Sequence, residues 1–583
     1  MVRFLWKYLK KNLPVLIANA LLVCLQTYLL VIVLMGQMRE IISRGVEAGD
    51  MDYILSCGGR MLLIILGISA CTVGYSYLSA ALTADTVGDI RTDLSDRILR
   101  LSLKDFGRFG GGSLRSRVTS DTISIQLLLI NLLRFGCTIP VVLICMLIVI
   151  AGISFRLFLP LAAVFILVCV FLFRFGSRAR PRYRALSVTL DEMNQKVGEN
   201  LQGVRTIRAF RRQGTELDRL LALNEKGKEQ AISAGLSTLW LSPVSLLVMN
   251  WCTVLIYVLG TGEIRNRMLS MGSLLLLFQY MGYFISCLSI IPTLVNVVPR
   301  ASVACRRIQE VLDQPADTGS EKADPACQVR SGTVSFSHVS FGYNGEKNVL
   351  DDVSFEARDG RITAFTGATG SGKTTLLNLL AGLYRKDSGR IDLGGRPLED
   401  YTDENLRAGL SYSLQGCPVF QDTIRENILA GSPLDEDRLR RVLQVSCLDE
   451  VVEGLPQGLD TVMAYGGMNL SGGQKQRLNI ARCLYRDVPV YLFDDSFSAL
   501  DPNTEKKVRE GMRAFLAGRT VLIVAQKIAS VKDADNIVLL DGGHVSAQGR
   551  HEELVRTSAL YRSILETQVY NDEEKISREK DQV

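Results

Sequence analysis

The sequence is organised around the stretch Gly367-Ala368-Thr369-Gly370-Ser371-Gly372-Lys373-Thr374, which fits the phosphate-loop pattern G-x-x-x-x-G-K-[ST] at every position. Residues Arg361–Thr366 before it are predicted to form a buried strand, and Thr375–Leu383 after it a helix with an apolar face. The glycines let the backbone curl so that successive N–H groups and a helix N-terminus point at one anion. Lys373 can reach the outer phosphates, and Thr374 can bind Mg²⁺. The stretch therefore predicts a nucleotide-binding site.

Apolar residues crowd into the first half of the chain. The 583 residues are 48% hydrophobic and carry a formal net charge of +6, and several long uncharged runs precede residue 300. This distribution predicts a membrane-embedded first half and a water-soluble second half. Basic residues gather beside the apolar runs, whereas nucleic-acid binding requires a basic patch interleaved with aromatic residues. We therefore expect membrane lipid as a partner and no nucleic acid.

Cysteine and histidine residues are scattered. No C-x-x-C pair occurs among the 13 cysteines, and the three histidines lie far apart in the sequence. Cysteines that stand singly within apolar runs are typical of small buried hydrophobic residues, which are far commoner there than disulfides or metal ligands. Those cysteines are Cys24, Cys71, Cys137, Cys145, Cys169, Cys252 and Cys287, and the histidines are His338, His544 and His551.

Six apolar segments can cross a bilayer as helices, since about 20 residues suffice. Long connections rich in arginine lie between the second and third segments and between the fourth and fifth, and the remaining connections are shorter and less basic. By the positive-inside rule, the long connections and both termini are cytoplasmic. We therefore expect a multi-pass protein of the plasma membrane, in a bacterium the inner membrane. The predicted spans are residues 13–35, 61–83, 128–153, 157–174, 239–260 and 270–296.

The long connections have helical periodicity in Leu94–Leu103 and Leu186–Val204, which predicts that the membrane helices extend into the cytoplasm. Short elements around Gly112–Asp121 and Gly203–Arg212 could rest on a soluble domain, although the periodicity also allows a separate small helical domain. Polar side chains within the spans either contact a substrate or join helices. These side chains are Gln26, Asn250 and Gln279.

The soluble half begins after a break in the apolar pattern. We divide the chain into a transmembrane domain of residues 1–312, a linker of residues 313–332, an α/β nucleotide-binding domain of residues 333–568 and a charged tail of residues 569–583. Strand-like patterns are visible at Thr333–Val339, Phe341–Tyr343, Val353–Ala357, Pro489–Phe493 and Thr520–Ala525.

Two further motifs accompany the phosphate loop. Asp494 and Asp495 directly follow the predicted buried strand Pro489–Phe493, and a carboxylate at such a strand end is the usual second anchor for Mg²⁺. The stretch Leu470-Ser471-Gly472-Gly473-Gln474 offers a hydroxyl group and backbone donors at a predicted helix N-terminus. Together these motifs predict a site for ATP with Mg²⁺.

In these motifs the chain resembles the ATP-binding cassette (ABC) exporters. Residues 333–568 resemble their P-loop nucleotide-binding domain, and residues 1–312 resemble their six-helix, all-α membrane domain. The resemblance implies that Tyr343 stacks on adenine, that Gln415 reaches Mg²⁺ and the attacking water, and that Asp494 closes the Walker B motif. It also implies a dimer, since each ATP lies between the phosphate loop of one domain and the signature sequence of the other.

The resemblance assigns further residues by their motifs. The phosphate loop Gly367–Thr374 would be the family's Walker A loop, and this loop and the residue after it would bind nucleotide. Thr374, Gln415 and Asp494 would bind the metal. The D-loop would be Ser498-Ala499-Leu500-Asp501, with Asp501 as its last residue. The nucleotide-binding residues are Tyr343, Gly367, Ala368, Thr369, Gly370, Ser371, Gly372, Lys373, Thr374 and Thr375. The signature residues, which would serve the partner's ATP, are Ser471, Gly472, Gly473 and Gln474.

Three places in the sequence, which comprise four residues, depart from the family pattern. Asp495 stands where the family has a glutamate that polarises the hydrolytic water, and Gln526 stands where it has a histidine. Tyr465 and Gly466 replace a glutamate and a basic residue often found before the signature. The Asp495 side chain is one methylene shorter than that glutamate, and misplacement by about 1 Å can cost on the order of a hundredfold in rate. The chain's own ATP site is therefore predicted to be slow.

This pattern is similar to the subunit with the degenerate ATP site in heterodimeric ABC exporters. The chain would then bind ATP at Walker A and contribute Ser471, Gly472 and Gly473 to the competent site of a second chain. Three alternatives stay open: neutral drift in an enzyme that still hydrolyses ATP, a homodimer with two slow sites, and an ATP-gated regulatory subunit that does not pump. A soluble ABC ATPase is excluded by the predicted spans. The substrate could be a small molecule, a lipid or a peptide.

Overall fold

The computed structural model describes residues 1–47, 49–239, 241–265, 269–315, 323–343, 348–416 and 418–568. It gives the backbone but not every side chain within residues 157–180, 237–249 and 285–296. The chain divides into two compact units. The first unit comprises residues 1–99 and 111–314, and the second comprises residues 100–110 and the chain from Pro315 onward.

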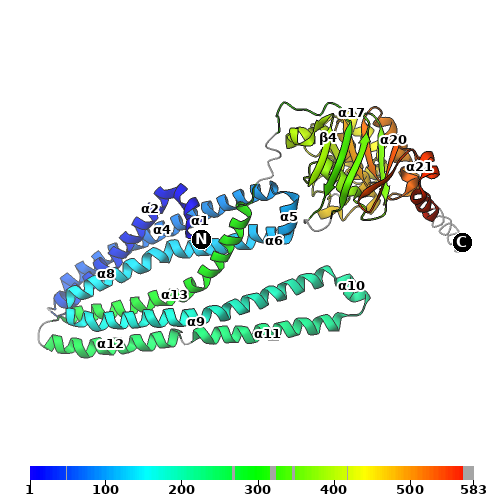
Figure 1. The fold of residues 1–583 in the computed structure, drawn as a ribbon. Coiled ribbons are helices and arrows are strands. Elements are labelled where there is room, and N and C mark those ends of the chain that lie inside the picture. Colours follow the sequence, from blue (N-terminus) through cyan, green and yellow to red (C-terminus); the bar gives the residue numbers. More distant parts are fainter. Residues whose placement is uncertain are drawn as a thin grey trace. The chain divides into compact units, whose positions relative to one another are not determined.

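The first unit is helical, and most of its helices are long (Figure 1). Helices α9 and α11 run side by side and are joined by the short helix α10. A core of apolar side chains, among them Val31, Val142, Ile256 and Leu277, joins α8, α12 and α13 to the π-helical turn Leu29–Leu34. The helices are α1 (Val2–Leu9), α2 (Leu13–Tyr28), α3 (Met35–Glu40), α4 (Met51–Leu99), α6 (Gly111–Ser116), α7 (Thr122–Asn131), α8 (Cys137–Ile153), α9 (Phe155–Gln202), α10 (Val204–Ala209), α11 (Gln213–Leu239), α12 (Leu241–Arg265) and α13 (Met271–Leu312).

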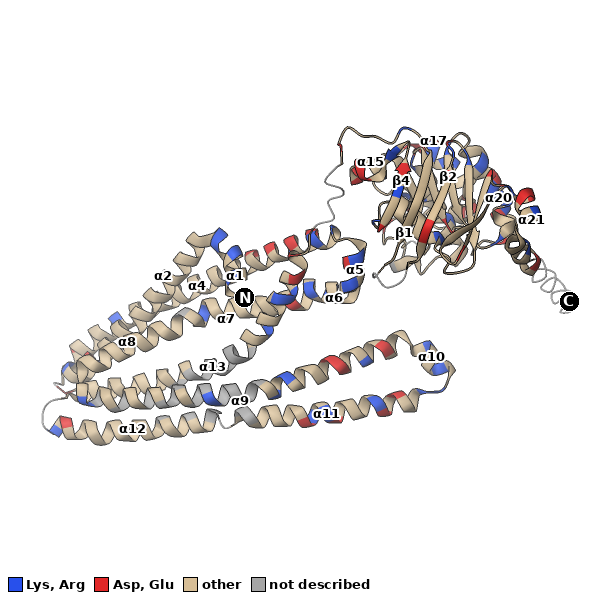
Figure 2. Ribbon diagram, in the orientation of Figure 1, with Lys and Arg blue, Asp and Glu red and all other residues tan. Residues whose placement is uncertain are grey.

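Four helical segments among the described residues are long and apolar enough to cross a membrane: Val2–Val46, Met51–Leu99, Gly111–Ile153 and Leu246–Arg265. A shorter apolar stretch, Met271–Phe284, lies in α13 within the predicted span 270–296. The predicted span 157–174 lies in α9, where many side chains are outside the described residues. Charged side chains are sparse along α8 and α12 and gather around α5 (Leu103–Phe109), α6 and α10 (Figure 2).

The helices continue well beyond the predicted spans. Helix α4 has 49 residues and α9 has 48, both longer than the roughly 20 residues that a bilayer requires. The helical periodicity predicted in the two long connections is confirmed over residues 94–99 and 186–202. Each connection therefore consists largely of uninterrupted extensions of apolar helices.

The second unit is built on two sheets. A four-stranded sheet has the order β2-β1-β4-β5, and a six-stranded sheet has the order β10-β9-β3-β8-β7-β6. The strands are β1 (Val334–Phe341), β2 (Leu350–Ala357), β3 (Ile362–Gly367), β4 (Ser388–Leu393), β5 (Arg396–Pro397), β6 (Leu410–Ser413), β7 (Val490–Asp494), β8 (Thr520–Val524), β9 (Asn536–Asp541) and β10 (His544–Gly549). The helices are α5 (Leu103–Phe109), α14 (Lys373–Leu380), α15 (Asp403–Gly409), α16 (Ile424–Leu429), α17 (Glu436–Val445), α18 (Asp449–Glu453), α19 (Gly472–Tyr485), α20 (Pro502–Phe515) and α21 (His551–Thr557).

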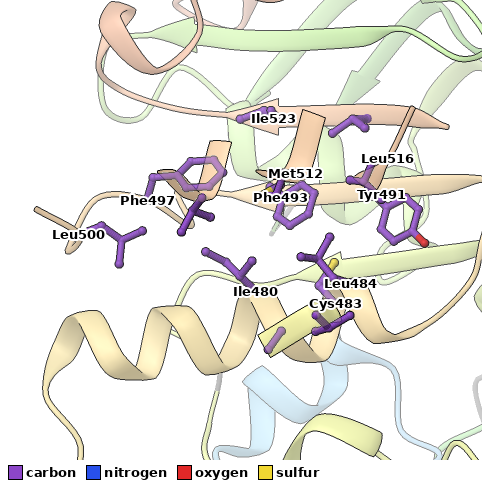
Figure 3. Close-up of a cluster of buried hydrophobic side chains, with 14 of the residues drawn as sticks. Ile480, Cys483, Leu484, Tyr491, Phe493, Phe497, Leu500, Met512, Leu516 and Ile523 are labelled. Carbon is purple, nitrogen blue, oxygen red and sulfur yellow. The ribbon is translucent and has the colours of Figure 1, made fainter. Parts of the chain in front are cut away.

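The parallel strands of the larger sheet are largely buried on both faces, whereas the edge strand β10 is not. Strands β9, β3, β8, β7 and β6 are parallel, and their short, continuous apolar runs suit a sheet covered by helices on both sides. Phe493 and Ile523 face helices α19 and α20 (Figure 3), whereas Leu492 and Leu522 belong to the core that includes α14. Because the strands are parallel, the residues that follow β3, β6, β7 and β8 meet at one edge.

Two predicted elements need correction. Phe341–Tyr343 is not a separate strand: β1 runs without interruption to Phe341, past irregular pairing near Val339, and Tyr343 lies after its end. The helix predicted at Thr375–Leu383 begins two residues earlier, at Lys373, because the phosphate loop leads directly into its first turn, and it ends at Leu380.

The predicted linker runs from residue 313 to residue 332. Its residues 316–322 lie outside the described residues. Beyond them, Cys327 is buried in the core of the second unit, and Asn405 Nδ2 donates to the carbonyl oxygens of Pro325 and Cys327 at 2.8 Å. The domain boundaries themselves remain predictions.

Candidate nucleotide site

The phosphate loop leaves the carboxyl end of β3 and enters α14. Gly367 has a φ of 145°, Gly370 84° and Gly372 97°, all in the region that favours glycine. A Cβ atom at Gly367 would lie 2.1 Å from the carbonyl oxygen of Leu540, and one at Gly372 would lie 2.5 Å from Leu350 Cδ2. The loop therefore takes a path that side chains would block, and the N-terminus of α14 lies at its end.

Lys373 lies in the first turn of α14 and is buried. Its Nζ donates to the carbonyl oxygens of Gly367 at 2.9 Å and Ala368 at 2.7 Å, and to Ser371 Oγ at 3.3 Å. Burial lowers the pKa of Lys373, and the neighbouring Asp495 and Asp494 carboxylates oppose that shift. The ammonium group is thus held inside the loop, where it can meet a phosphate group bound by the loop N–H groups.

Asp494 ends β7 and is 1% exposed. Its Oδ1 accepts a hydrogen bond of 3.0 Å from Thr374 Oγ1, and its Oδ2 has no hydrogen-bond partner among the described residues. Burial raises the pKa of Asp494, and the nearby Asp495 raises it further, whereas the Thr374 hydrogen bond lowers it. A buried carboxylate oxygen without a partner beside a hydroxyl group fits Mg²⁺, which prefers oxygen ligands and completes its shell with water and phosphate.

Asp495 follows Asp494 in a left-handed conformation, with a φ of 47°. Its backbone is well held: the N–H donates to Val524 O at 3.0 Å, and its carbonyl oxygen accepts from Ser498 Oγ at 3.0 Å. Its half-buried carboxylate accepts a long bond of 3.4 Å from Gln415 Nε2. Burial raises the pKa of Asp495, and hydrogen bonds from Ser498 and Gln415 lower it. The structure thus brings two predicted residues, Gln415 and Asp495, together.

Two further predicted site residues are Tyr343 and Gln526. Tyr343 OH lies 3.0 Å from Thr375 Oγ1, and its ring packs edge-on against Phe341 and Tyr384. Gln526 is exposed and is the second residue after β8, and its carbonyl oxygen accepts from Gln568 Nε2 at 2.9 Å. Both residues lie beside elements that carry the loop and Asp495, while their roles toward adenine and the γ-phosphate stay predictions.

The predicted signature begins α19. Ser471 is the N-cap: its Oγ accepts from Gln474 N at 3.3 Å, and Gln474 Oε1 accepts from Ser471 N at 2.8 Å. This reciprocal capping box leaves the N–H groups of the exposed Gly472 and the half-buried Gly473 in the first turn of the helix, an arrangement that favours anions. Asp501 caps α20 by accepting from Thr504 N at 3.0 Å.

One residue of this region carries no motif and was missed by sequence reasoning. Gln476 Oε1 accepts from Ala499 N at 2.8 Å, and its Nε2 donates to Ser498 Oγ at 3.0 Å and Asp495 O at 3.4 Å. Gln476 therefore ties the helix of the predicted signature to the segment that follows Asp495. A single glutamine inside a helix gives no sequence signal for such a role.

The polar residues predicted within the membrane spans are less constrained. Gln26 and Gln279 are half-buried, and Asn250 is exposed beside Trp251. Sequence reasoning passed over two other polar residues, Asn19, which bonds with Leu133 and Ser79, and Arg134, which bonds with Ser76. Arg134 was visible as a charged residue inside the apolar run 128–153.

Comparison with known families and proteins gives matches over most of the chain. Residues 15–288 match the ABC transporter transmembrane region, and residues 350–498 match the ABC transporter family. The chain is 33% identical over 533 residues to the uncharacterized ABC transporter ATP-binding protein YfiB of Bacillus subtilis, with 91% of this chain and 92% of that protein covered. It is 28% identical over 522 residues to a multidrug resistance ABC transporter ATP-binding and permease protein of Lactococcus lactis, with 88% and 87% covered.

A solved structure of a bacterial Atm1-family ABC exporter with ATP bound has the same fold. The TM-score is 0.83 at 23% identity, with 96% of this chain and 98% of that chain covered. The helical unit, the phosphate loop with its buried Asp494, and the sequence relatives agree. This chain belongs to the ABC transporter family, with a transmembrane region and an ATP-binding domain in one polypeptide.

Proposed function

We propose that the chain is one half of an ABC exporter, the subunit with the slow ATP site, and that it works with a second half-transporter chain. ATP with Mg²⁺ would bind at its phosphate loop, and a small molecule, lipid or peptide would be moved across the membrane. We place the protein in the plasma membrane, as a multi-pass protein with both termini in the cytoplasm. The multidrug resistance relative from Lactococcus lactis favours export as the direction.

At the chain's own site, each residue has a distinct task. The loop N–H groups and Lys373 bind and orient the phosphates, and the Thr374 and Asp494 oxygens hold Mg²⁺, which neutralises charge on the phosphates. Gln415 and Asp495 would orient the attacking water. Closure of two nucleotide domains on ATP follows from the higher affinity of the closed state for ATP, so a site that hydrolyses slowly still drives switching.

The observation that carries the slow-site proposal is the loosely held carboxylate of Asp495. Its carboxylate accepts a bond of 3.4 Å from Gln415, at the weak end of hydrogen-bond geometry. An aspartate carboxylate reaches one methylene less far than a glutamate. Since in-line attack tolerates little misplacement of water, the rate at this site is expected to fall on the order of a hundredfold. Gln526, which has no titratable ring, would not compensate.

A second chain is favoured by apolar side chains that this chain leaves uncovered outside the predicted spans. On α11, Leu217, Leu221, Ile232 and Leu236 are 53–55% exposed, as two pairs at i,i+4 spacing. Exposed apolar surface of this kind marks protein interfaces, and lipid does not cover it here because the predicted span begins at residue 239. The exposed capping box at Ser471 likewise offers donors that could meet a partner's ATP.

The experiment compares two variants in the reconstituted complex with its partner chain. Ser471→Arg should nearly abolish ATP hydrolysis and vesicle transport, because it blocks the donors given to the partner's site, whereas Asp495→Asn should change both little. The reverse ranking would contradict the proposed division of labour. The ATP hydrolysis rates of the two variant complexes are measured by phosphate release at saturating ATP.

Two rival functions have separate outcomes. A homodimer with two slow sites predicts that the purified chain alone has substrate-stimulated ATP hydrolysis, whereas the proposed heterodimer subunit alone should have little or none. A regulatory, ATP-gated subunit predicts passive movement in sealed vesicles. Movement against a gradient that requires hydrolysis excludes such a gate.

A further inference from the structure

Arg134 is a charged residue where an apolar environment is expected. It lies six positions inside the predicted span 128–153, in the π-helical turn Leu132–Gly136 between α7 and α8. A charged side chain at such a depth is rare in membrane helices and usually faces a water-filled pathway or a partner group. π-helical turns are also frequent at functional sites.

The guanidinium group has a neutral partner and no acidic one. Arg134 Nη2 donates to Ser76 Oγ on α4 at 3.1 Å, and within the described part of the chain Arg134 makes no ion pair. Guanidinium offers five N–H donors in a planar fork that matches carboxylate and phosphate groups. Since Arg134 is half-buried, the remaining donors are partly accessible.

Arg134 stands in a built polar node, which we define as Asn19, Ser76, Ser79, Leu133 and Arg134. Asn19 is 1% exposed; its Nδ2 donates to Leu133 O at 3.4 Å, and its Oδ1 accepts from Ser79 Oγ at 2.9 Å. These two bonds already join α2, α4 and the turn that carries Arg134. Holding the helices together thus does not require a charge at this position.

The predicted spans 61–83 and 128–153 place the polar node at a similar depth in the bilayer. Ser76 lies seven residues before the end of the span 61–83, and Arg134 lies six residues after the start of the span 128–153, which corresponds to about 10 Å at the usual helical rise. Both span ends adjoin the arginine-rich segment that we assign to the cytoplasm. The node would therefore lie in the cytoplasmic half of the bilayer.

We propose that the polar node binds the acidic group, carboxylate or phosphate, of an amphipathic anion whose apolar part lies among the membrane helices. The anion is either the transported molecule or a membrane lipid headgroup. Its identification as the transported molecule rests on the proposed export function, whereas anion binding at Arg134 does not. On this basis amphipathic anions are the substrate class to be tested first.

The test measures binding without nucleotide, so that it is independent of ATP hydrolysis. The full-length protein, with its partner where one co-purifies, is titrated with sodium laurate or with dodecanol in maltoside micelles, and its thermal stability is followed. Laurate should stabilise the wild type and dodecanol should not. Arg134→Gln should weaken the laurate effect about tenfold or more, because a charge-assisted bond is lost. Arg134→Lys should retain part of it.

The control is Arg60→Gln, an exposed arginine on the same helix as Ser76, which should leave laurate binding unchanged. The proposal is overturned if the wild type and Arg134→Gln bind laurate equally, or if dodecanol binds as well as laurate. It is also overturned if the wild type is stabilised neither by laurate nor by phosphatidylglycerol in nanodiscs. Stabilisation by phosphatidylglycerol that needs Arg134 and removes the laurate effect identifies a lipid headgroup as the anion. If the complex did not hydrolyse ATP, the proposed export function would be overturned, whereas the proposal of anion binding at Arg134 would not be affected.

Discussion

Asp494 and Asp495 are neighbours in the sequence, yet the fold treats them differently. Asp494 closes a buried strand, is 1% exposed and accepts a 3.0 Å bond from Thr374. Asp495 lies one residue beyond the strand at a φ of 47°, is half-buried and accepts a long bond of 3.4 Å from Gln415. The first carboxylate is fixed before any ligand arrives, and the second is fixed mainly through its backbone.

This difference separates binding from catalysis within one site. A pre-organised carboxylate whose Oδ2 accepts no hydrogen bond from the described residues suits a metal ion, whose binding needs fixed ligands. Orientation of a water molecule needs a side chain held by its own contacts, and Asp495 has little of this. A site of this kind would bind ATP firmly and hydrolyse it slowly.

The largest effect is expected for Asp494→Asn. It removes the charge that would hold Mg²⁺, so Mg²⁺-dependent ATP binding and the associated hydrolysis should fall on the order of a hundredfold. Binding of a fluorescent ATP analogue with and without Mg²⁺ measures this change. Asp437→Asn, an exposed site on α17, is the matched control and should have no effect.

Asp494→Asn should also stabilise the nucleotide-free protein at pH 7. Burial raises the pKa of Asp494 in the folded chain, so the folded state binds more protons than the unfolded state between the ordinary and the raised pKa. Stability is therefore lost as pH rises through that interval, and asparagine avoids this loss. A melting temperature below that of the wild type at pH 7, or an increase that persists at pH 3, would contradict this account.

An intermediate effect is expected for Asp495→Glu. The longer side chain restores the reach that the family's glutamate has, so hydrolysis by the chain alone should rise about tenfold, less than the full hundredfold because Gln526 remains. Phosphate release from the purified chain measures it. An unchanged rate would mean that the distance between carboxylate and water does not limit hydrolysis at this site.

Sequence reasoning reached the motifs because each depends on local chemistry. The glycines of the phosphate loop have positive φ angles and no room for a Cβ, so only glycine satisfies positions 367 and 372. Ser471 and Gln474 form a capping box, which depends on residues three apart. The family and the fold followed from these signals, and the comparisons agree with them.

Contacts between segments that are distant in the sequence could not be predicted in the same way. The pairing of Gln415 with Asp495 joins residues 80 apart, and the bond from Asn19 to Leu133 spans 114. Nothing in either local sequence encodes the partner. Strand ends also shifted, as at Phe341, because the pairing of β1 with β2, rather than side-chain alternation, decides where β1 stops.

The smallest effect is expected for Gln476→Ala, which tests whether the surroundings of Asp495 depend on α19. The variant removes the bonds to Ala499 N and Ser498 Oγ, each worth about 1 kcal/mol, and frees the segment that connects Asp495 with the cap of α20 at Asp501. Because α19 also carries the predicted signature residues that would serve the partner's ATP, hydrolysis by the complex should fall by a factor of about 3 to 10, with a slightly lower melting temperature, since a loss of about 1 kcal/mol corresponds to such a factor. Gln444→Ala, on an exposed face of α17, is the control. If both variants behave like the wild type, the backbone bonds of Asp495 to Val524 and Ser498 suffice to hold the loop, and its weak side-chain contact alone accounts for the contrast with Asp494.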